Sequence, residues 1–399
     1  MKFAHLGDCH IGGWREPKLK DLGVSAFVKA IDSCIAKEVD FILISGDLFN
    51  TPLPSIDGLK NAVTKLKEAK DKGIPVYVIA GSHDFSASGK TMLDVLEKAD
   101  LFINVFKGSV ENGILKLKFT HDPKTEAKIT GIIGKKGMLD KKYYEQLDKA
   151  ALENEPGFKI FMFHTALDEL KTKDLERMES APLSLMPKGF DYYAGGHVHI
   201  VTHKTFDGYK HVTYPGALFP NNFSELEKFK HGGFYIYNEG EVTWEPVIVS
   251  NVESFSINCD GKTPFDVKQL ILDQVKDKEL NNAIVTIRLS GVLDGKVSDI
   301  EFKEIFDLLN SKSASFVMKN TNALQMKGFE EVEVDSGSVE ETEEKLISES
   351  SGQISIEGDE KELTKQLMLV LSAEKAEGEK TSDYEKRVVD ETKKVLGLD

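Results

Sequence analysis

Two residues of metal-binding type stand two positions apart near the start of the chain. Asp8 and His10 follow a short apolar run, residues 3–6, which we expect to form a buried strand. In an extended segment this spacing points both side chains to one side, where a carboxylate oxygen and an imidazole nitrogen can share one cation. Alone the pair is a weak signal, because a turn Asp and a surface His give the same string.

The same arrangement recurs after four further apolar runs. The residues that follow the runs at 41–45, 76–80, 160–163 and 192–194 are Asp47; Ser82, His83 and Asp84; His164; and His197 with His199. Ligands of open α/β sheets usually bind at the carboxyl ends of the strands, so we expect these side chains to meet at one edge. A single His after a strand is more often structural, but five such segments together predict a metal site.

Carboxylates and imidazoles gathered in this way suit the hydrolysis of a phosphodiester. This reaction needs a strong nucleophile at neutral pH and neutralisation of the charge that grows on the phosphoryl oxygens, and two cations about 4 Å apart supply both. Asp47 is the candidate bridge, because the other ligands would leave the two sites unlinked. Mixed oxygen and nitrogen ligation favours manganese, iron or zinc over magnesium or calcium.

The elements that must position these residues indicate an α/β fold. The runs named above are apolar on both faces, as buried strands are, and helical spacing of apolar residues lies between them at 27–35 and 59–66. Further strands are expected at 114–119, 129–133 and 233–237. We predict that this first domain spans residues 1–250.

The rest of the chain divides into three parts by composition. Residues 251–330 predict a small α/β domain, 331–360 an acidic, Ser-rich linker, and 361–399 a pair of amphipathic helices. A helical pair beyond an acidic linker has little core of its own, so its apolar faces indicate a docking surface for a partner. The alternative is that the pair packs back on the body.

Composition places the chain among soluble globular proteins. Nothing predicts a membrane span or a secretory signal, so we expect a cytoplasmic protein, and three cysteines without paired spacing argue against disulfides and thiolate zinc sites. Of the 66 acidic and 51 basic residues, 20 and 9 lie in residues 331–399. The net charge of -15 is therefore -11 in this tail and only -4 in residues 1–330, which leaves room for basic patches.

The motifs resemble those of the calcineurin-like metallophosphoesterase superfamily, in which D-x-H, G-D, G-N-H-[DE], H and G-H-x-H occur in this order. The resemblance implies a four-layer β-sandwich flanked by helices. It also implies two metal ions, one held by Asp8, His10, Asp47 and His199, and the other by Asp47, Ser82, His164 and His197. His83 is similar to the family's catalytic histidine, and Asp84 either orients its ring or closes a turn.

More narrowly, residues 2–6, 41–49 and 214–216 look like the Mre-eleven nucleases of archaea, related to bacterial SbcD. This resemblance implies a manganese-dependent nuclease with 3'-5' exonuclease and endonuclease activity that processes double-strand breaks beside the nucleoid. It implies a Rad-fifty type ATPase as partner of the C-terminal helices, a capping domain at 251–330 that selects DNA, and a homodimer formed through helices near residues 59–69 and 92–96.

Two positions depart from the family pattern. Ser82 stands where the family has Asn, so a metal-binding amide oxygen is replaced by a shorter hydroxyl, which predicts a weakly held second metal and reduced activity. Asn50 stands where some relatives carry His. Two alternatives therefore remain beside the nuclease: a catalytically weak scaffold that bridges DNA and the ATPase, and a phosphoesterase of small substrates. His5, inside a strand, is expected to be a packed structural residue.

Overall fold

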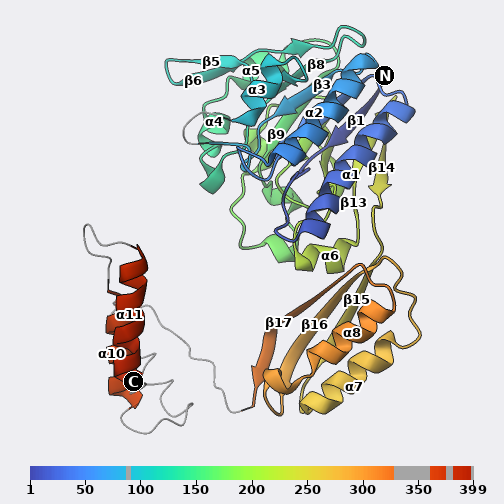
Figure 1. Ribbon diagram of the computed structural model, residues 1–399. Helices are drawn as coiled ribbons and strands as arrows, with labels where there is room; N and C mark the ends of the chain where they lie inside the picture. Colours follow the sequence, from blue (N-terminus) through green and yellow to red (C-terminus); the bar gives the residue numbers. More distant parts are fainter. Residues whose placement is uncertain (87–90, 328–359, 374–380, 397–399) are drawn as a thin grey trace. The chain divides into compact units, whose positions relative to one another are not determined.

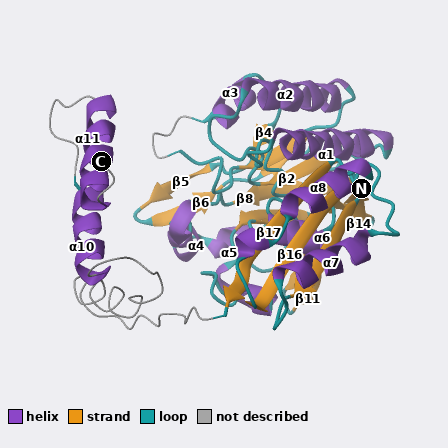
Figure 2. Ribbon diagram, turned by 60° about the horizontal axis from the view of Figure 1, so that its bottom comes forward, coloured by secondary structure: helices purple, strands orange, loops and turns teal. Residues whose placement is uncertain are grey.

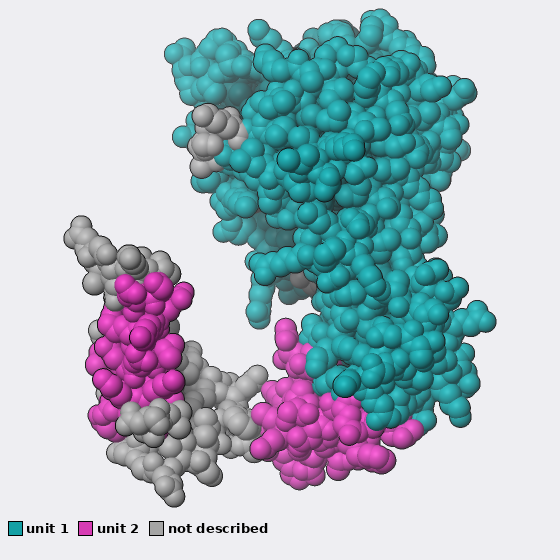
Figure 3. All heavy atoms as spheres, viewed as in Figure 1, with its two compact units in different colours: residues 1–257, 271–288, 302–320 teal, residues 258–270, 289–301, 321–399 magenta. Residues whose placement is uncertain are grey.

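The computed structural model describes residues 1–86, 91–327, 360–373 and 381–396. It divides into two compact units, which Figure 3 distinguishes by colour. The first holds residues 1–257, 271–288 and 302–320, and the second holds 258–270, 289–301 and 321–399. All the candidate metal ligands lie in the first unit.

Two six-stranded sheets form the body of the first unit (Figure 1). The first sheet has the order β14 (Glu241–Val247), β13 (Gly232–Asn238), β1 (Lys2–Leu6), β2 (Phe41–Ser45), β3 (Val76–Ile79) and β4 (Ile103–Asn104). The second has the order β11 (Val201–Phe206), β12 (Tyr209–Pro215), β10 (Tyr192–Gly196), β9 (Lys159–His164), β8 (Lys128–Gly131) and β7 (Thr120–His121).

The strands at the centre of both sheets run parallel. β1, β2 and β3 pair in this way in the first sheet, and β8, β9 and β10 in the second. Parallel strands are covered on both faces, which explains why every residue of β2, β3, β9 and β10 is buried. The register also brings the strand ends level, so that the loops after them leave the sheets at one edge.

Helices cover the outer faces of the two sheets. α1 (Pro17–Ala36), α2 (Ile56–Asp71) and α3 (Met92–Lys98) contribute to one hydrophobic cluster with β1, β2 and β3. α4 (Lys141–Glu145) and α5 (Lys149–Glu153) contribute to another with β9 and β10. Figure 2 shows the first three helices on the side of the first sheet that faces away from α4 and α5.

A third cluster of large side chains lies between the sheets. Phe3 stacks on Phe41 and Tyr237 with ring centroids 4.9 and 4.6 Å apart, and it meets the edge of Tyr192 from the second sheet at 5.0 Å. Such aromatic contacts add to the stability that comes from burying the rings. The order of layers is thus helices, sheet, sheet and helices, which confirms the four-layer α/β fold expected from the sequence.

The remaining elements are smaller. A hairpin joins β5 (Gly108–Glu111) to β6 (Ile114–Leu117), and α6 (Phe223–Phe229) precedes β13. A three-stranded sheet has the order β15 (Val252–Asn258), β16 (Ile284–Leu293) and β17 (Phe316–Met326), with α7 (Pro264–Val275) and α8 (Phe302–Ser311) between its strands in the chain. These are the elements expected for residues 251–330, although the compact units divide that range between them.

The C-terminal pair consists of α10 (Glu360–Leu371) and α11 (Thr381–Leu396). The Tyr384 hydroxyl of α11 donates a hydrogen bond of 3.1 Å to the carbonyl oxygen of Ala373, two residues after the end of α10. The expected linker at 331–360 lies outside the described residues, apart from Glu360 at the start of α10. Within the described ranges, no helix is both long enough and apolar enough to cross a membrane.

Candidate metal centre

Five loops that leave the strand ends bring the candidate ligands together. The loops after β1 and β2 are joined by backbone hydrogen bonds, from the Asp8 amide to the Gly46 carbonyl at 3.2 Å and from the His10 amide to the Asp47 carbonyl at 2.9 Å. The second sheet is joined to them through the His197 amide, which donates to both oxygens of Asp8 at 2.9 and 3.1 Å. The two sheets therefore form one site.

The backbone at this edge adopts conformations that side chains rarely occupy. Asp8, His10, Asp47 and His197 have φ angles of 50°, 42°, 51° and 93°. Non-glycine residues with positive φ are uncommon, and they cluster at functional sites where the surrounding structure holds the strained conformation in place. Four candidate ligands in this region indicate that the loops are shaped for the positions of these side chains rather than for local stability.

Asp8, His10 and His199 form the first group of possible ligands. The Nε2 atoms of His10 and His199 lie 3.0 Å apart, and Nε2 of His199 lies 4.0 Å from Oδ1 of Asp8. One ligand atom from each residue falls within 4.8 Å of the others. Asp8 is fully buried and His10 nearly so, so the group lies at the floor of the site.

Asp47 lies between this group and His164. Its Oδ2 is 3.7 Å from Nε2 of His10 and 3.2 Å from Nε2 of His164. It therefore takes part in two further groups of possible ligands, one with His10 and His83 and one with Asp8 and His164. This is the position that a carboxylate bridging two cations would occupy.

His197 and Ser82 lie beside the groups without belonging to them. The His197 ring centroid is 5.2 Å from that of His164. Ser82 is buried, and it lines a cavity of about 400 Å³ together with His83, His164 and His197. The structure thus brings all seven predicted metal-binding positions to one edge, with Ser82 and His197 on the side of His164.

His83 and Asp84 have different partners from those expected for a catalytic pair. The His83 amide donates to Oδ1 of Asp47 at 2.8 Å, and its ring Nδ1 lies 3.0 Å from the Asn50 carbonyl oxygen. The Asp84 carboxylate accepts from the amides of Leu48, Phe49 and Gly81 at 3.2, 3.0 and 3.1 Å. Asp84 thus holds together the loops after β2 and β3. The Asn50 carbonyl, rather than the Asp84 carboxylate, is the partner of the His83 ring.

Burial and nearby carboxylates shift the pKa values of the site histidines in opposite directions. Burial lowers the pKa of His10 to about 3 and that of His197 to about 4. Burial also opposes charge on His164, but the carboxylates of Asp47 and Asp8 raise its pKa to about 10. The same carboxylates that attract a proton to His164 would attract a cation, since both respond to the same field.

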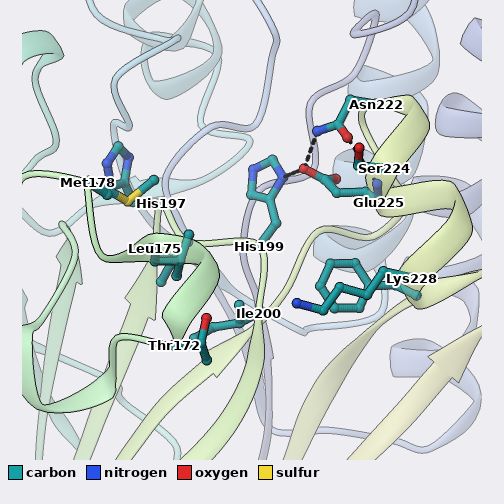
Figure 4. Close-up of a pocket in the computed structure, with 12 residues that line it drawn as sticks. Thr172, Leu175, Met178, His197, His199, Ile200, Asn222, Ser224, Glu225 and Lys228 are labelled. Atoms are coloured by element: carbon teal, nitrogen blue, oxygen red, sulfur yellow. Dashed lines mark hydrogen bonds and ion pairs between the residues drawn. The ribbon is translucent and has the colours of Figure 1, made fainter. Parts of the chain in front are cut away.

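Glu225 is a contributor that the sequence reasoning missed. Its Oε1 lies 2.9 Å from Nδ1 of His199. Burial opposes charge on the His199 ring, but the bond to Glu225 and the nearby Asp8 carboxylate raise the pKa of His199 to about 9. Figure 4 shows Glu225 between His199 and Asn222, the residue whose side chain caps α6. The spacing Asn-x-x-Glu at the start of a helix is a capping-box pattern, and it was the available signal.

A second cavity lies beside these residues. It measures about 470 Å³, and its lining includes His197, His199 and Glu225 together with the apolar side chains of Leu175, Ile200 and Phe229 (Figure 4). His197 therefore lines both cavities, whereas His199 lines this one and His83 and His164 line the cavity of Ser82. Both cavities lie within the first unit.

The residues present fit a divalent cation. Two imidazole nitrogens, from the buried His10 and the partly buried His199, face each other at 3.0 Å. Within the described residues, the other nitrogen of His10, Nδ1, is buried without a hydrogen-bond partner. Metal-bound histidines typically bond their second nitrogen to a carboxylate or carbonyl, as His199 does to Glu225 and His164 does to the Ser45 carbonyl at 2.8 Å. Carboxylate and imidazole donors together favour transition metals over magnesium or calcium.

The chain is similar to known proteins. The model of the calcineurin-like phosphoesterase family matches residues 1–201. The chain is 26% identical to the DNA double-strand break repair protein Mre11 of Methanococcus maripaludis over 87% of its own length and 90% of that protein. It is 28% identical to Mre11 of Methanocaldococcus jannaschii, over 78% and 80% of the two chains. For Mre11 of Archaeoglobus fulgidus the identity is 25%, over 67% and 61%. The chain therefore belongs to the calcineurin-like phosphoesterase family.

Proposed function

We propose that this protein is a manganese-dependent DNA nuclease that processes double-strand breaks together with a Rad-fifty type ATPase. The observation that carries the proposal is the shared position of Asp47 between two groups of possible ligands, in which every residue except His83 is buried. Similarity to archaeal Mre11 proteins over most of the chain supports DNA as the substrate. Both 3'-5' exonuclease and endonuclease activity belong to the proposal.

In this proposal Asp8, His10, Asp47 and His199 hold one cation, and Asp47, Ser82, His164 and His197 hold the other. When bound, the cations supply a nucleophile at neutral pH and neutralise charge on the phosphoryl oxygens. Glu225 orients the His199 ring for this purpose through its bond to Nδ1. Manganese is the proposed metal, and iron or zinc would suit the same donors.

His83 is proposed to assist the leaving oxygen. A carbonyl oxygen only accepts hydrogen bonds, so the contact with Asn50 requires a hydrogen on Nδ1 of His83 and leaves Nε2 as the atom that gains or loses a proton. The ring lies 4.9 Å from that of His10 between centroids, at the border of the ligand groups. It can therefore donate a proton to, or stabilise charge on, an oxygen that leaves the phosphoryl group.

Ser82 favours a second candidate function, a weakly catalytic scaffold that bridges DNA and the ATPase. The hydroxyl is shorter than the amide of the family's Asn, and it lies in the cavity lined by His164 and His197. If the second cation is loosely held, hydrolysis of DNA would be slow, but binding of DNA and of the ATPase and dimerisation would be unaffected. Metal content measured beside a nuclease assay separates the two candidates.

The proposed partners use surfaces outside the metal centre. On the C-terminal pair, Leu369, Leu371 and Val389 are 75, 59 and 51% exposed, and we assign these exposed apolar side chains to contacts with the ATPase. On the first unit, Ile56 and Val95 of α2 and α3 are 83 and 57% exposed and are assigned to a homodimer. Residues 251–330 are proposed as the capping domain that selects DNA, and the protein as cytoplasmic and associated with the nucleoid.

The test is digestion of linear duplex DNA with manganese, with and without the partner ATPase, beside cleavage of a chromogenic phosphodiester. The proposal expects metal-dependent shortening of the DNA that Asp8→Ala abolishes. Cleavage of the chromogenic diester without any cleavage of DNA would instead identify a phosphoesterase of small substrates. DNA and ATPase binding without hydrolysis of either substrate would identify the scaffold.

A further inference from the structure

A lysine side chain is held in the cavity that contains the candidate catalytic histidine. The lining of this cavity of about 400 Å³ includes Lys135, Asp140 and Glu179 beside Ser82, His83 and His164. The Lys135 ammonium donates a hydrogen bond of 2.8 Å to the Tyr143 hydroxyl. It also lies 4.6 Å from the centroid of the Tyr143 ring and 5.1 Å from that of Phe85, close enough for cation–π attraction to both.

The loop that carries Lys135 is fixed to the metal centre by its backbone. The Gly134 amide donates to the carbonyl oxygen of Ala80 at 2.9 Å, two residues before Ser82. A Cβ atom added to Gly134 would lie 2.3 Å from Cδ2 of His164, so this glycine is required for the loop to touch the imidazole. Lys135 is therefore one residue away from a contact with a candidate ligand.

The charge of Lys135 is not neutralised by its neighbours. Within the described residues, no carboxylate forms an ion pair with its ammonium. The Asp140 carboxylate accepts from the Lys135 amide rather than from the ammonium, and burial raises the pKa of Asp140. Glu179, the other acid of the lining, is exposed to solvent. The aromatic rings hold the cation in place without cancelling its charge, as a site for an anion requires.

We propose that Lys135 binds a backbone phosphate of the DNA strand next to the phosphate that is cleaved, which rests on the proposed nuclease function. The scissile phosphate has the metal ligands and His83 to receive it, and Lys135 contacts none of these side chains through its ammonium. A DNA strand carries a charge at every nucleotide, and a positioned lysine fixes its register without reading the sequence.

The experiment compares Lys135→Met with Lys204→Met on two substrates. Met keeps a flexible apolar stem against the two rings, so folding is expected to persist, and Lys204 is an exposed lysine on β11 whose removal changes net charge equally. A chromogenic phosphodiester contains only the scissile phosphate, whereas DNA contains its neighbours as well. DNA binding is measured in EDTA at several salt concentrations, and melting temperatures are recorded for every variant.

For Lys135→Met we expect KM for DNA to rise about tenfold with kcat within about twofold, and kcat/KM for the chromogenic diester to stay within about twofold. The slope of log affinity against log salt should fall by about 0.7 to 0.9, the contribution of one phosphate contact. Lys204→Met should leave the kinetics on both substrates and the slope unchanged, and Lys135→Arg, which keeps the charge, should restore most of the DNA binding.

Three outcomes overturn the inference. An equal loss of activity on both substrates would place Lys135 at the scissile phosphate or assign it a structural role. An unchanged KM and salt slope would remove it from DNA binding. Failure of the wild-type protein to bind DNA would overturn the inference together with the proposed function. If the wild-type protein cleaves DNA, the proposed function stands, and the Lys135 variants decide the inference alone.

Discussion

At the scale of single residues, position 82 is where we expect this chain to depart from the family pattern. Ser82 is buried on the side of the centre that holds His164 and His197. A serine hydroxyl ends one atom closer to the backbone than an asparagine amide oxygen does. In the proposed ligand sets, a cation on this side would keep Asp47, His164 and His197 if the hydroxyl of Ser82 falls short, whereas the other cation would have four ligands, Asp8, His10, Asp47 and His199.

The first prediction concerns this position. Ser82→Asn is expected to raise bound manganese toward two ions per chain and to increase DNA cleavage by about tenfold, because removing or restoring one contact at a metal site typically changes affinity or activity by about 10 to 100 times. Metal content after dialysis and a nuclease assay measure the two effects. Ser82→Ala should behave like the wild type, and an Asn variant with unchanged stoichiometry and cleavage would contradict the prediction.

A second prediction concerns Glu225. Glu225→Gln keeps an acceptor for Nδ1 of His199 but removes the charge, so manganese affinity should fall by about tenfold. Titration of metal-free protein with manganese measures it. Glu227→Gln on the same helix is the control, because Glu227 pairs with Arg288 and not with a candidate ligand. Equal affinities for the two variants would show that His199 needs no charged partner.

A third prediction concerns pH and His5. The Ser45 hydroxyl donates its hydrogen to the Ala194 carbonyl, so its oxygen accepts from Nε2 of His5. The Thr213 hydroxyl, which also lies near Nδ1 of His5, donates to the Tyr193 carbonyl. Nδ1 of His5 therefore accepts its hydrogen bond from the Tyr192 hydroxyl. Burial lowers the pKa of this neutral imidazole to about 3. The structural role expected for a histidine inside a strand is thus confirmed.

In the unfolded chain the His5 ring takes up a proton near pH 6.5. The contribution of neutral His5 to the free energy of unfolding is therefore fully present above that pH. It is lost at up to about 1.4 kcal/mol per pH unit as the pH falls toward 3. Urea unfolding at pH 7.5, 6, 5.5 and 5 should show a steeper loss for the wild type than for His5→Gln. Parallel curves would mean that His5 does not titrate on unfolding.

At the scale of elements, glycines allow the strand ends to approach each other. A Cβ atom at Gly196, the last residue of β10, would lie 2.0 Å from the Ser45 carbonyl oxygen and 2.8 Å from Nδ1 of His164. These two atoms bond to each other at 2.8 Å. The contact between the two sheets at the metal centre therefore depends on the missing side chain.

The fourth prediction follows from this contact. Gly196→Ala should destabilise the fold by about 1–3 kcal/mol, as inserted atoms do in packed cores, and should weaken manganese binding through His164. Gly23→Ala, within α1, is the control. The nearest atom to its added Cβ would be Cδ1 of Phe219 at 4.0 Å, so this substitution should be neutral or stabilise the fold by about 0.5–1 kcal/mol. Thermal unfolding of both variants checks the prediction, which fails if their stabilities agree.

The apolar runs of the sequence predicted the central elements well, and the edges poorly. β2 occupies the range expected for it, and β1, β3 and β9 differ from expectation by one or two residues. β11, β12 and β14 were not predicted. β11 and β14 lie at sheet edges and most of their residues are at least partly exposed, whereas β12 lies inside its sheet but carries Lys210, His211 and Thr213 among its apolar residues. The hydrophobic pattern is strong only where both faces of a strand are covered.

At the scale of the whole molecule, metal binding is expected to couple to stability. Asp8 and Asp47 are both buried within one site, and a ligand that binds only the folded state stabilises it by about 2.7 kcal/mol at 100 times its dissociation constant. The fifth prediction is that manganese raises the melting temperature relative to protein in EDTA. Asp47→Asn should remove most of this increase, because Asp47 belongs to ligand groups on both sides of the centre.

A melting temperature that responds to manganese equally in wild type and Asp47→Asn would locate the stabilising ion elsewhere. The C-terminal pair offers a second control. Removal of residues 360–399 should leave the manganese effect on the first unit unchanged, since the pair contributes none of the candidate ligands.

The sequence by itself determined which strand ends carry the candidate ligands and what chemistry those residue types suit. Five apolar runs, each followed by a carboxylate, an imidazole or a hydroxyl, predict a shared edge because strand ends converge in any layered α/β fold. The charge pattern likewise assigned most of the net negative charge to the tail. Both conclusions depend only on residue types and their order along the chain.

The tertiary structure decided the contacts between segments far apart in the sequence. It placed Asp47 between His10 and His164, gave Glu225 to His199, turned Asp84 to the backbone of three loop residues and put Lys135 into the cavity of His83. Side-chain direction after a strand end is set by loop backbone angles, such as the positive φ of Asp8 and Asp47, and by packing of one sheet on the other. Neither follows from the order of residues alone.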